Sequence, residues 1–400
     1  MEKKRLLIVG AGAAGTILAN SVDMKRYDVT VIDPSEMHIF QPQWLYVAFK
    51  GQKEMSKRER SLLKGRVELV RDAVTDVDLN AMSVKTASGK TYQYDYIAIA
   101  TGIVGALDRI PGLAAVNAEF GDYHTGAGQA MKVWKHLRNF KGGTIAIGQS
   151  YPLCKCPPSP LEGAFLAEEL IRRKGLKDKT HIVFFTPYPR AYPAEAINEL
   201  MEPLLKERNI EVMTFFDVDK IDAVEHTISS IEGDTIKYDL PIIIPPCSGI
   251  GINYSPADVV GRDRLLQADK YTMHIKGFDN AFALGDSAAL PTAKSGVGAH
   301  LEAKVVASLL NGHEARFTGR TNCPFDTGYG RGTFVIGSYD EPVVKYPLSE
   351  FHLIMKHMMA KIYWQSLKGM FDKAFDIYFS ETDPKKLKPK YGVGRKEQPK

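Results

Sequence analysis

The stretch LLIVGAGAAG, residues 6–15, decides the fold of this chain. Its apolar first half predicts a short strand, which runs into a G-x-G-x-x-G turn and then into a helix. Gly10 allows the tight turn, Gly12 lets the backbone approach a pyrophosphate, and Gly15 lets the helix pack closely on the strand. Because the helix N-terminus then faces the phosphates, the stretch predicts a dinucleotide-binding unit.

The next strands extend this unit. Strand 29–32 ends at Asp33, where a carboxylate is expected to bind a ribose hydroxyl. A buried parallel strand over 94–100 ends in Thr101 and Gly102 and closes the first nucleotide-binding half. The alternative, a glycine-rich turn with an unrelated aspartate, is disfavoured because strand, turn, helix and acid occur in the expected order.

The composition limits the class of protein. The 400 residues allow two or three domains, and 44% hydrophobic with 25% charged residues is ordinary for a folded chain. The sequence has no apolar run long enough to cross a bilayer, and the glycine turn begins too early for a signal peptide, so we expect the chain on the cytosolic side. The net charge of +5 is concentrated in residues 384–400, and nucleic acid is not an expected partner.

A second α/β unit is predicted between about residues 103 and 277. Residues 143–148 again form a strand followed by glycine, but Ser150 and Leu153 stand where the phosphate-binding pattern requires glycine. This half therefore copies the architecture without the phosphate cradle. A nicotinamide nucleotide is accordingly disfavoured as the electron source.

A later segment points back to the first nucleotide site. Strand 280–284 ends in Gly285 and Asp286, and an aspartate at the carboxyl end of such a strand points into the ligand crevice. The alternative for Asp286 is a helix N-cap. Lys294 and the start of helix 297–310 are expected to stabilise negative charge on a ligand there.

The chain is expected to divide into four segments. An aromatic loop over residues 37–46, centred on Pro42, lies in the first segment and would wall a flat ring or serve only for packing. The last segment is expected to carry helices and a basic tail. The expected segments are the first part of a nucleotide-binding domain (1–102), a second Rossmann-like domain (103–277), the rest of the first domain with a cysteine (278–340), and a C-terminal segment (341–400).

The order of these motifs resembles that of the FAD-dependent flavoproteins with two dinucleotide-binding domains. Residues 156–162 (CPPSPLE) and 322–330 (NCPFDTGYG) are similar to the two cysteine segments of sulfide:quinone oxidoreductases and of the flavoprotein subunit of flavocytochrome c sulfide dehydrogenase. The resemblance covers about residues 1–370 and implies an α/β fold with two Rossmann-like domains and FAD as cofactor. The FAD contacts it implies are Gly10, Gly12, Ala14, Gly15, Asp33, Pro42, Thr101, Gly102, Gly285, Asp286 and Lys294.

The resemblance also implies a redox disulfide between Cys156 and Cys323. Attack of HS⁻ on this disulfide would give a persulfide on one sulfur and a thiolate on the other. Cys323 would be the sulfur on the flavin side, Cys156 would carry the growing sulfur chain, and Glu162 would act as the base. Cys154 would shuttle sulfur or have no role, and Lys294 would stabilise the reduced flavin.

The cysteines also allow other interpretations. Cys154 and Cys156 form half of a metal-ligand pattern, but a second pair at ligand spacing is absent from the sequence, so no metal is predicted. Lys155 is expected to lower the pKa of both neighbouring thiols. Cys247 is interpreted as a packing cysteine. Residues 123–141 contain no cysteine, which leaves none there for thioether attachment of FAD.

Residues 351–379 predict two amphipathic helices with a break near Gly369, because apolar residues recur at helical spacing. Together with the basic tail, this pattern predicts in-plane docking on a membrane, and packing on the core or on a dimer partner is the alternative. Phe325, Tyr329 and Phe334 are candidates to sandwich a quinone ring. The apolar positions are Phe351, Met355, Met358, Ile362, Leu367, Phe371, Phe375 and Tyr378, flanked by Lys356, Lys361, Lys368 and Lys373.

The hypothesis from these observations is a peripheral membrane flavoprotein that oxidises sulfide through a cysteine disulfide and FAD and reduces a quinone. The first alternative passes the electrons to a cytochrome c. The others are a type II NADH:quinone oxidoreductase, which Ser150 and Leu153 disfavour, and a flavin-binding redox sensor without turnover. A homo-oligomer is compatible with each of them.

Overall fold

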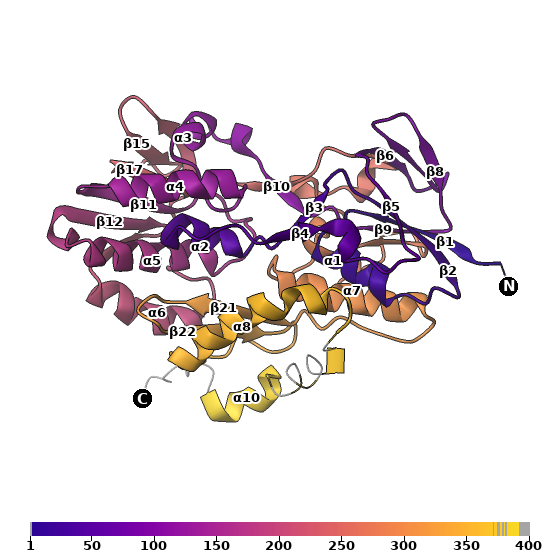
Figure 1. Ribbon diagram of the computed structural model, residues 1–400. Coiled ribbons are helices and arrows are strands. Elements are labelled where there is room, and N and C mark those ends of the chain that lie inside the picture. The colour runs from indigo at the N-terminus through magenta and orange to yellow at the C-terminus, as the bar shows by residue number, and fades with distance from the viewer. Residues whose placement is uncertain (1, 371, 374–376, 378–379, 381, 392–400) are drawn as a thin grey trace.

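The structure is a computed structural model that describes residues 2–370, 372–373, 377, 380 and 382–391. Two parallel sheets lie at opposite ends of the molecule, and the C-terminal helices run along one side of it (Figure 1). The first sheet contains β1, the strand of the glycine stretch, at its centre. Its strands are β20 (Ala281–Ala283), β9 (Tyr96–Ile99), β1 (Lys4–Val9), β2 (Tyr27–Ile32) and β5 (Glu68–Val70), in that order and all parallel.

The first sheet forms because its strands are short apolar runs that can be buried on both faces. Helices α1 (Ala13–Ser21) and α7 (Gly296–Leu310) pack against each other beside it. The core around the sheet also receives side chains from residues 252–275, which lie before the boundary expected at residue 277. The first core therefore combines three separate parts of the chain, residues 6–100, 252–317 and 364–367.

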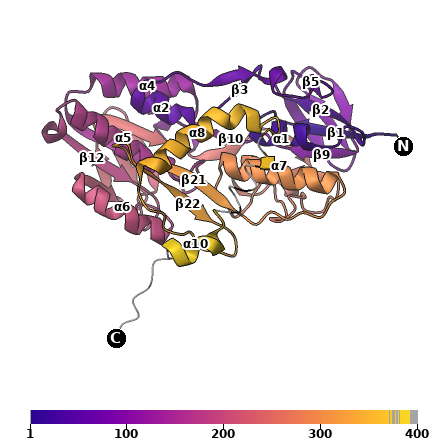
Figure 2. The ribbon, with the colours of Figure 1, turned by 60° about the horizontal axis from the view of Figure 1, so that its bottom comes forward.

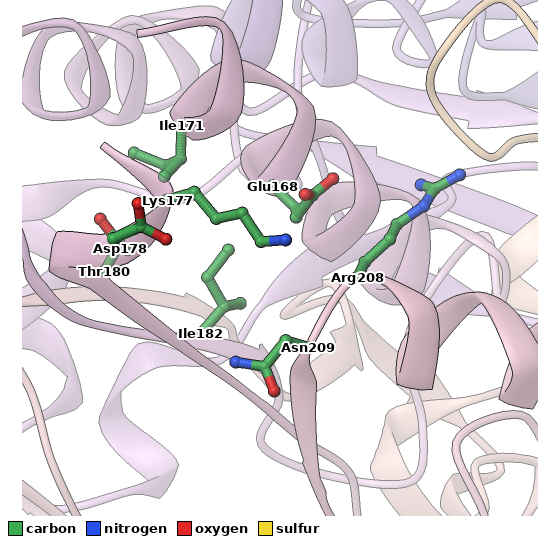
Figure 3. Close-up of a pocket in the computed structure, with 8 residues that line it drawn as sticks. All are labelled: Glu168, Ile171, Lys177, Asp178, Thr180, Ile182, Arg208 and Asn209. Atoms are coloured by element: carbon green, nitrogen blue, oxygen red, sulfur yellow. The ribbon is translucent and has the colours of Figure 1, made fainter. Parts of the chain in front are cut away.

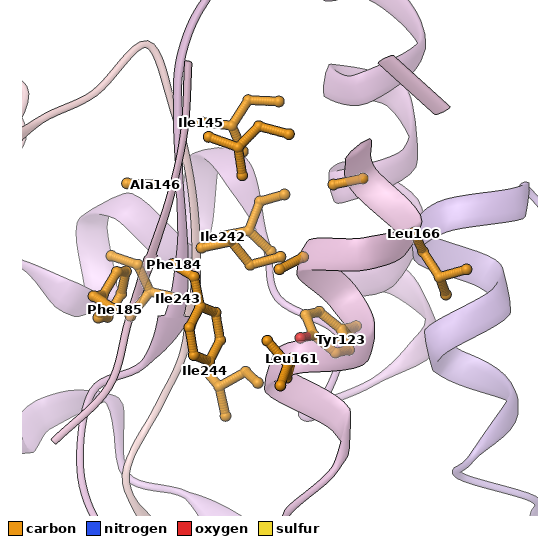
Figure 4. Close-up of a cluster of buried hydrophobic side chains, with 14 of the residues drawn as sticks. Tyr123, Ile145, Ala146, Leu161, Leu166, Phe184, Phe185, Ile242, Ile243 and Ile244 are labelled. Carbon is orange, nitrogen blue, oxygen red and sulfur yellow. The ribbon is translucent and has the colours of Figure 1, made fainter. Parts of the chain in front are cut away.

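The second sheet is also parallel and carries helices α3 (Leu113–Phe120), α4 (Ala127–Asn139), α5 (Ser159–Arg173) and α6 (Glu195–Glu207). Figure 4 shows its core, where Leu161 of α5 and Tyr123 face the isoleucines of the central strands. The predicted pair of Rossmann-like units is confirmed. The strand order is β13 (Ile210–Met213), β12 (Thr180–Phe185), β11 (Gly143–Gln149) and β17 (Leu240–Ile244).

Smaller sheets join and flank the two units. Strand β10 (Ile103–Gly105) pairs with β18 (Cys247–Gly249) between the two units, and β3 (Met37–Ile39) pairs with β4 (Ser56–Arg58). The remaining small sheets are β19 (Asn253–Ser255) with β6 (Val74–Asp78), β7 (Ser83–Thr86) and β8 (Thr91–Gln93), and β14 (Val218–Asp222) with β15 (Thr227–Ser230) and β16 (Thr235–Lys237).

The segment expected to be an aromatic loop is a strand followed by a helix. After β3, helix α2 (Gln43–Lys50) begins directly behind Pro42, which occupies the N-cap position. Proline suits the start of a helix because an N–H is not needed there. Trp44 and Phe49 of α2 enter the core of the second unit, although the helix lies within residues 1–102.

The C-terminal part of the chain covers the side of both units. Strands β21 (Thr321–Asp326) and β22 (Gly332–Gly337) form an antiparallel hairpin, and helix α8 (Glu350–Ser366) lies across it (Figure 2). The short helix α10 (Pro384–Tyr391) contacts the same hairpin through Leu387, so the start of the basic tail is packed on the protein.

Candidate active site

The glycine turn has the shape of a nucleotide cradle. Gly10 has φ +101°, and a Cβ atom there would lie 2.5 Å from the carbonyl oxygen of Ala100. A Cβ atom on Gly15 would lie 1.9 Å from the carbonyl oxygen of Gly10, so both glycines are required by the protein itself. Gly12 differs because its Cβ position faces open space. An open backbone at the N-terminus of α1 leaves room for a pyrophosphate.

The acid at the end of β2 is held beside this turn. The backbone N–H of Ala11 donates a hydrogen bond to Asp33 Oδ2 at 2.6 Å. On the other side of β1, Gly102 follows β9 with φ +69° and also faces open space. Gly285 follows β20 with φ +67°, and its Cβ position is 3.3 Å from the side chain of Ala14. Gly10, Gly12, Asp33, Gly102 and Gly285 thus lie at the carboxyl edge of one sheet, and this cradle fits FAD, whereas Pro42 lies outside this edge at the start of α2.

Buried charges lie behind the β20 end of the cradle. Burial raises the pKa of Asp286, while the neighbouring Lys155 and Lys294 oppose this shift. Glu302 of α7, which sequence reasoning missed, accepts the N–H of Gly285 at 2.6 Å, and burial raises its pKa to about 7. The sequence feature that indicates burial of Glu302 is its position on the same helix face as the small apolar residues Ala299 and Ala303.

The structure brings Cys156 and Cys323 together from the two halves of the chain. Cys156 has φ +55°, and its N–H donates to the carbonyl oxygen of Lys294 at 2.7 Å. Cys323 is buried on β21 and is hydrogen-bonded to Ser295, the residue after Lys294. Because Lys294 and Ser295 are adjacent, these two bonds bring Cys156 and Cys323 into the same region, and the charge of Cys323 is among the causes that raise the pKa of Cys156. All four cysteines of the chain are free thiols in the structure.

Glu162 lies in the first turn of α5, behind both thiols. Its carboxylate is buried and accepts the backbone N–H of Asp326 at 2.5 Å. It is also bonded to the ammonium group of Lys356 on α8. Burial raises the pKa of Glu162, and Lys356 opposes this shift. A carboxylate with a raised pKa beside thiols suits a group that exchanges protons with sulfur.

The expected effect of Lys155 is wrong. Its ammonium group donates to Gln41 Oε1 at 2.8 Å and lies 5.3 Å from the ring centroid of Trp44, and Lys155 is not among the charges that shift the pKa of Cys154 or Cys156. Burial instead raises the pKa of both flanking thiols, Cys154 and Cys156. It also raises the pKa of the Cys323 thiol, to about 11. The cation that favours the thiolates of Cys156 and Cys323 is Lys356, which lowers the pKa of both against this burial effect.

The other two cysteines lie in different surroundings. Cys154 is buried, and its thiol donates to Gln149 Oε1 at 3.6 Å. Cys247 is buried in a small apolar cluster with Ile103 and Leu265, as expected for a packing cysteine. In the part of the chain that the structure describes, there is no cluster of three or more side chains able to hold a metal ion.

The three aromatic candidates for a quinone sandwich do not meet. Phe325 pairs with Thr333 and Pro324 pairs with Phe334 in the hairpin, so Phe325 and Phe334 project from opposite faces. Phe325 packs in the second core, and Phe334 packs with α8 and α10. Tyr329 lies beyond the hairpin turn, 40% exposed, and donates to Glu168 Oε2 at 2.8 Å. One ring cannot contact all three.

Helix α8 has an exposed apolar face, but one of its lysines points inward. Phe351, Ile354 and Met358 are 64%, 53% and 49% exposed and recur at helical spacing. Lys356, expected at the surface, is buried against Glu162. Phe371, Phe375 and Tyr378 of the expected stripe lie outside the described residues. Within the described ranges, the structure contains no helix with the length and hydropathy of a membrane span.

A separate cavity of about 180 Å³ lies in the second unit (Figure 3). It is lined by Glu168, Lys177, Asp178, Thr180 and Asn209, among others, at the end of the sheet where β12 and β13 begin. Nucleotides bind at the carboxyl ends of such strands. This cavity is therefore not a second dinucleotide site.

Comparisons with known proteins agree with this geometry. The mitochondrial sulfide:quinone oxidoreductases of Dictyostelium discoideum and Mus musculus are 26% and 27% identical to the chain, covering 91% and 90% of it and 86% of each relative. The crystal structure of the sulfide:quinone oxidoreductase from Aquifex aeolicus superposes with a TM-score of 0.80 at 20% identity, over 94% of this chain and 95% of that one. The model of the pyridine nucleotide-disulphide oxidoreductase family matches residues 4–303. The chain therefore belongs to the pyridine nucleotide-disulphide oxidoreductase family.

Proposed function

We propose that the protein is a sulfide:quinone oxidoreductase that binds FAD. The observation that carries this proposal is the convergence of the half-buried Cys156 and the buried Cys323 on one buried carboxylate, Glu162. The backbone N–H of Cys156 and the thiol of Cys323 bond to Lys294 and Ser295, in a segment that belongs to the nucleotide-binding unit. The mitochondrial relatives that match most of the chain carry this name.

The proposed chemistry begins from the oxidised pair of cysteines. HS⁻ attacks a Cys156–Cys323 disulfide, the bond between the cysteines breaks, a new S–S bond forms on Cys156, and Cys323 leaves as a thiolate. Glu162 takes the proton of the incoming sulfide or of the persulfide, because it is the buried carboxylate beside both sulfurs. Bound FAD supplies a two-electron acceptor for the reduced sulfur. The residues proposed to hold it are those of the cradle, above all Gly10, Gly12 and Asp33.

A nicotinamide donor is not part of this proposal. Ser150, which replaces a glycine of the phosphate pattern, is fully buried, and its hydroxyl donates to the carbonyl oxygen of Ile244 at 2.8 Å. The chain between β11 and α5 is occupied by the cysteine segment instead of an open glycine turn. These features support sulfur rather than NADH as the source of electrons.

We propose that α8 seats the protein on a membrane, where a lipid-soluble quinone accepts the electrons. The exposed face of Phe351, Ile354 and Met358 with Lys361 beside it has the apolar and basic character of an in-plane membrane helix. We propose the cytoplasmic side of the cell membrane as the site of docking. Phe325, Tyr329 and Phe334 do not form one sandwich around a quinone ring, because Phe325 and Phe334 project from opposite faces of the hairpin.

The proposal is tested with the purified flavoprotein under anaerobic conditions. Sulfide should bleach the visible flavin absorbance within the mixing time of a manual assay, and NADH should not. Cys156→Ser and Cys323→Ser should each abolish the response to sulfide and retain FAD, whereas Cys247→Ser should behave as wild type. Sulfide bleaching that persists in both site variants would remove the cysteine mechanism, and bleaching by NADH alone would favour a type II NADH:quinone oxidoreductase.

A further inference from the structure

Lys356 is oriented differently from the other lysines of the C-terminal segment. It follows Ile354 of the exposed apolar face by two residues, so on a helix it points to the other side. Its side chain is 11% exposed, whereas Lys361 and Lys368 are exposed. Leu353 and Trp364, which are buried, share its side of α8. Lys356 therefore occupies a position on the inward face of α8, where its neighbours are buried apolar residues.

Charged and titratable groups from four elements surround its ammonium group. Glu162 of α5 binds it directly, and the carboxylate of Asp326 at the end of β21 lies close enough to raise its pKa. Tyr46 of α2 has its ring centroid 5.7 Å from the ammonium nitrogen and donates its hydroxyl proton to Asp326 Oδ2 at 3.1 Å. Lys50, one turn further along α2, lies 3.4 Å from the same oxygen.

Three further groups, one histidine and two thiols, complete these surroundings. His357 follows Lys356 on α8, and its ring lies 5.3 Å from that of Tyr46. Burial lowers the pKa of His357, so this side chain is neutral near pH 7. The thiols of Cys156 and Cys323 lie on the other side of Glu162. Asp326 thus has Lys50 as a cation of its own, and Lys356 is the cation left to Glu162.

The balance of charge decides what Lys356 does. Burial alone would lower the pKa of Lys356, but Glu162 and Asp326 raise it above its ordinary value, so the side chain is a cation. Burial alone favours a protonated, uncharged Glu162, and the ammonium group opposes this. Removing one partner of a buried ion pair leaves the other charge uncompensated. Without Lys356, Glu162 would take up a proton before sulfide arrived and would no longer serve as a base.

We propose that Lys356 is a positioning residue of the cysteine site, which keeps Glu162 ionised and favours the thiolate forms of Cys156 and Cys323. This inference rests on the proposed function for its catalytic meaning. The proton then moves from the incoming sulfide to the Glu162 carboxylate while the S–S bond between the cysteines breaks, so an external oxidant is not needed in this step. Helix α8 is in that case a part of the active site as well as the carrier of the exposed apolar face.

The test uses alkylation of the two thiols, which does not depend on sulfide. The FAD-bound protein is reduced with a phosphine, exposed to iodoacetamide over a range of pH, and the modification of Cys156 and Cys323 is followed separately by mass spectrometry. At the alkaline pH at which these thiols ionise, Glu162 is ionised with or without Lys356, so only the ammonium charge is lost in Lys356→Met. Both pH profiles should therefore move upward by about one unit, which is about a tenfold loss of rate at a fixed pH on the rising part of the profile, as expected for the loss of a neighbouring opposite charge. Lys356→Arg should restore most of the rate, and Lys361→Met on the exposed face should leave the profiles unchanged.

Glu162→Gln gives a second measurement with the opposite sign. The carboxylate raises the pKa of both thiols, so its removal should move the alkylation profiles downward. This variant keeps the inference testable if Lys356→Met does not fold, which loss of the FAD absorbance and of the native circular dichroism signal would reveal. Profiles of Lys356→Met and Lys356→Arg that both overlay that of the wild type, or an upward shift in Glu162→Gln, would overturn the inference. Failure of the wild type to react with sulfide would overturn the proposed function alone.

Discussion

The carboxyl edges of the two parallel sheets start from the same design and end with different chemistry. At the first edge, β1 runs into glycines that leave the backbone open at Gly12. At the second edge, β11 runs into the buried Ser150 and then into the segment with Cys154 and Cys156. A strand followed by a helix provides a crevice in both cases. The few residues between them decide whether the crevice receives a phosphate or presents a thiol.

The largest expected effect would break the first half of this comparison. Gly12→Val should abolish FAD binding, with a loss of affinity of about a hundredfold or more, because the side chain would fill space that the protein leaves open for the cofactor. The protein should still fold, because its own atoms do not occupy that space. Flavin content after purification measures this. Gly128→Val, at another glycine with open space, is the matched control and should keep its FAD; a yellow Gly12→Val protein would contradict the assignment.

The next effect concerns the second edge. Glu162→Gln should slow the reaction with sulfide by about a hundredfold while FAD stays bound, because a positioned general base contributes a factor of this size. Stopped-flow bleaching under anaerobic conditions measures the rate. Glu168→Gln, at a buried acid on the same helix that bonds to Arg172 and Tyr329, should have a much smaller effect. Equal rates in both variants would mean that Glu162 is not the base.

A smaller effect is expected from changes in α8, the helix whose Lys356 reaches Glu162 at the second edge. Ile354→Asp with Met358→Asp should weaken binding to liposomes by about tenfold or more, because two exposed apolar side chains are replaced by charges that anionic lipids repel. Co-sedimentation with phosphatidylglycerol vesicles measures this. Val224→Asp, at an exposed apolar residue of the second unit, should have no effect. Unchanged sedimentation of the α8 variant would argue that the helix instead contacts another protein surface.

The smallest expected effect is on stability in acid. His124 Nε2 is hydrogen-bonded to Ser159 Oγ at 2.9 Å at the start of α5, and burial lowers the pKa of this histidine to about 3. Below about pH 6.5 this histidine is protonated in the unfolded chain but stays neutral in the folded protein. Its contribution to the free energy of unfolding is therefore fully present above that pH and is lost as the pH falls toward 3. The melting temperature of His124→Gln minus that of the wild type should therefore be more positive at pH 5 than at pH 8. An identical pH dependence in both proteins would show that His124 does not contribute.

Much of the site could be predicted because its residues act through local backbone geometry. The glycines of the turn, Asp33 and the ends of β9 and β20 follow directly from strands and turns that are readable in the sequence. Cys156 and Cys323 are predicted from the resemblance of residues 156–162 and 322–330 to two cysteine segments of known flavoproteins. Their common neighbour Lys356 was assigned to the surface, because periodicity shows that a helix has two faces but not which face turns inward.

The tertiary structure decided everything that depends on packing between distant elements. The register of the β21–β22 hairpin separates Phe325 from Phe334, since neighbouring side chains on a strand alternate between faces. The contact of α8 with that hairpin brings Lys356 to Glu162, from 194 positions away in the chain. Sequence periodicity determines which helix or strand a segment can form. Which distant residues that helix or strand contacts is decided only by packing in the folded protein.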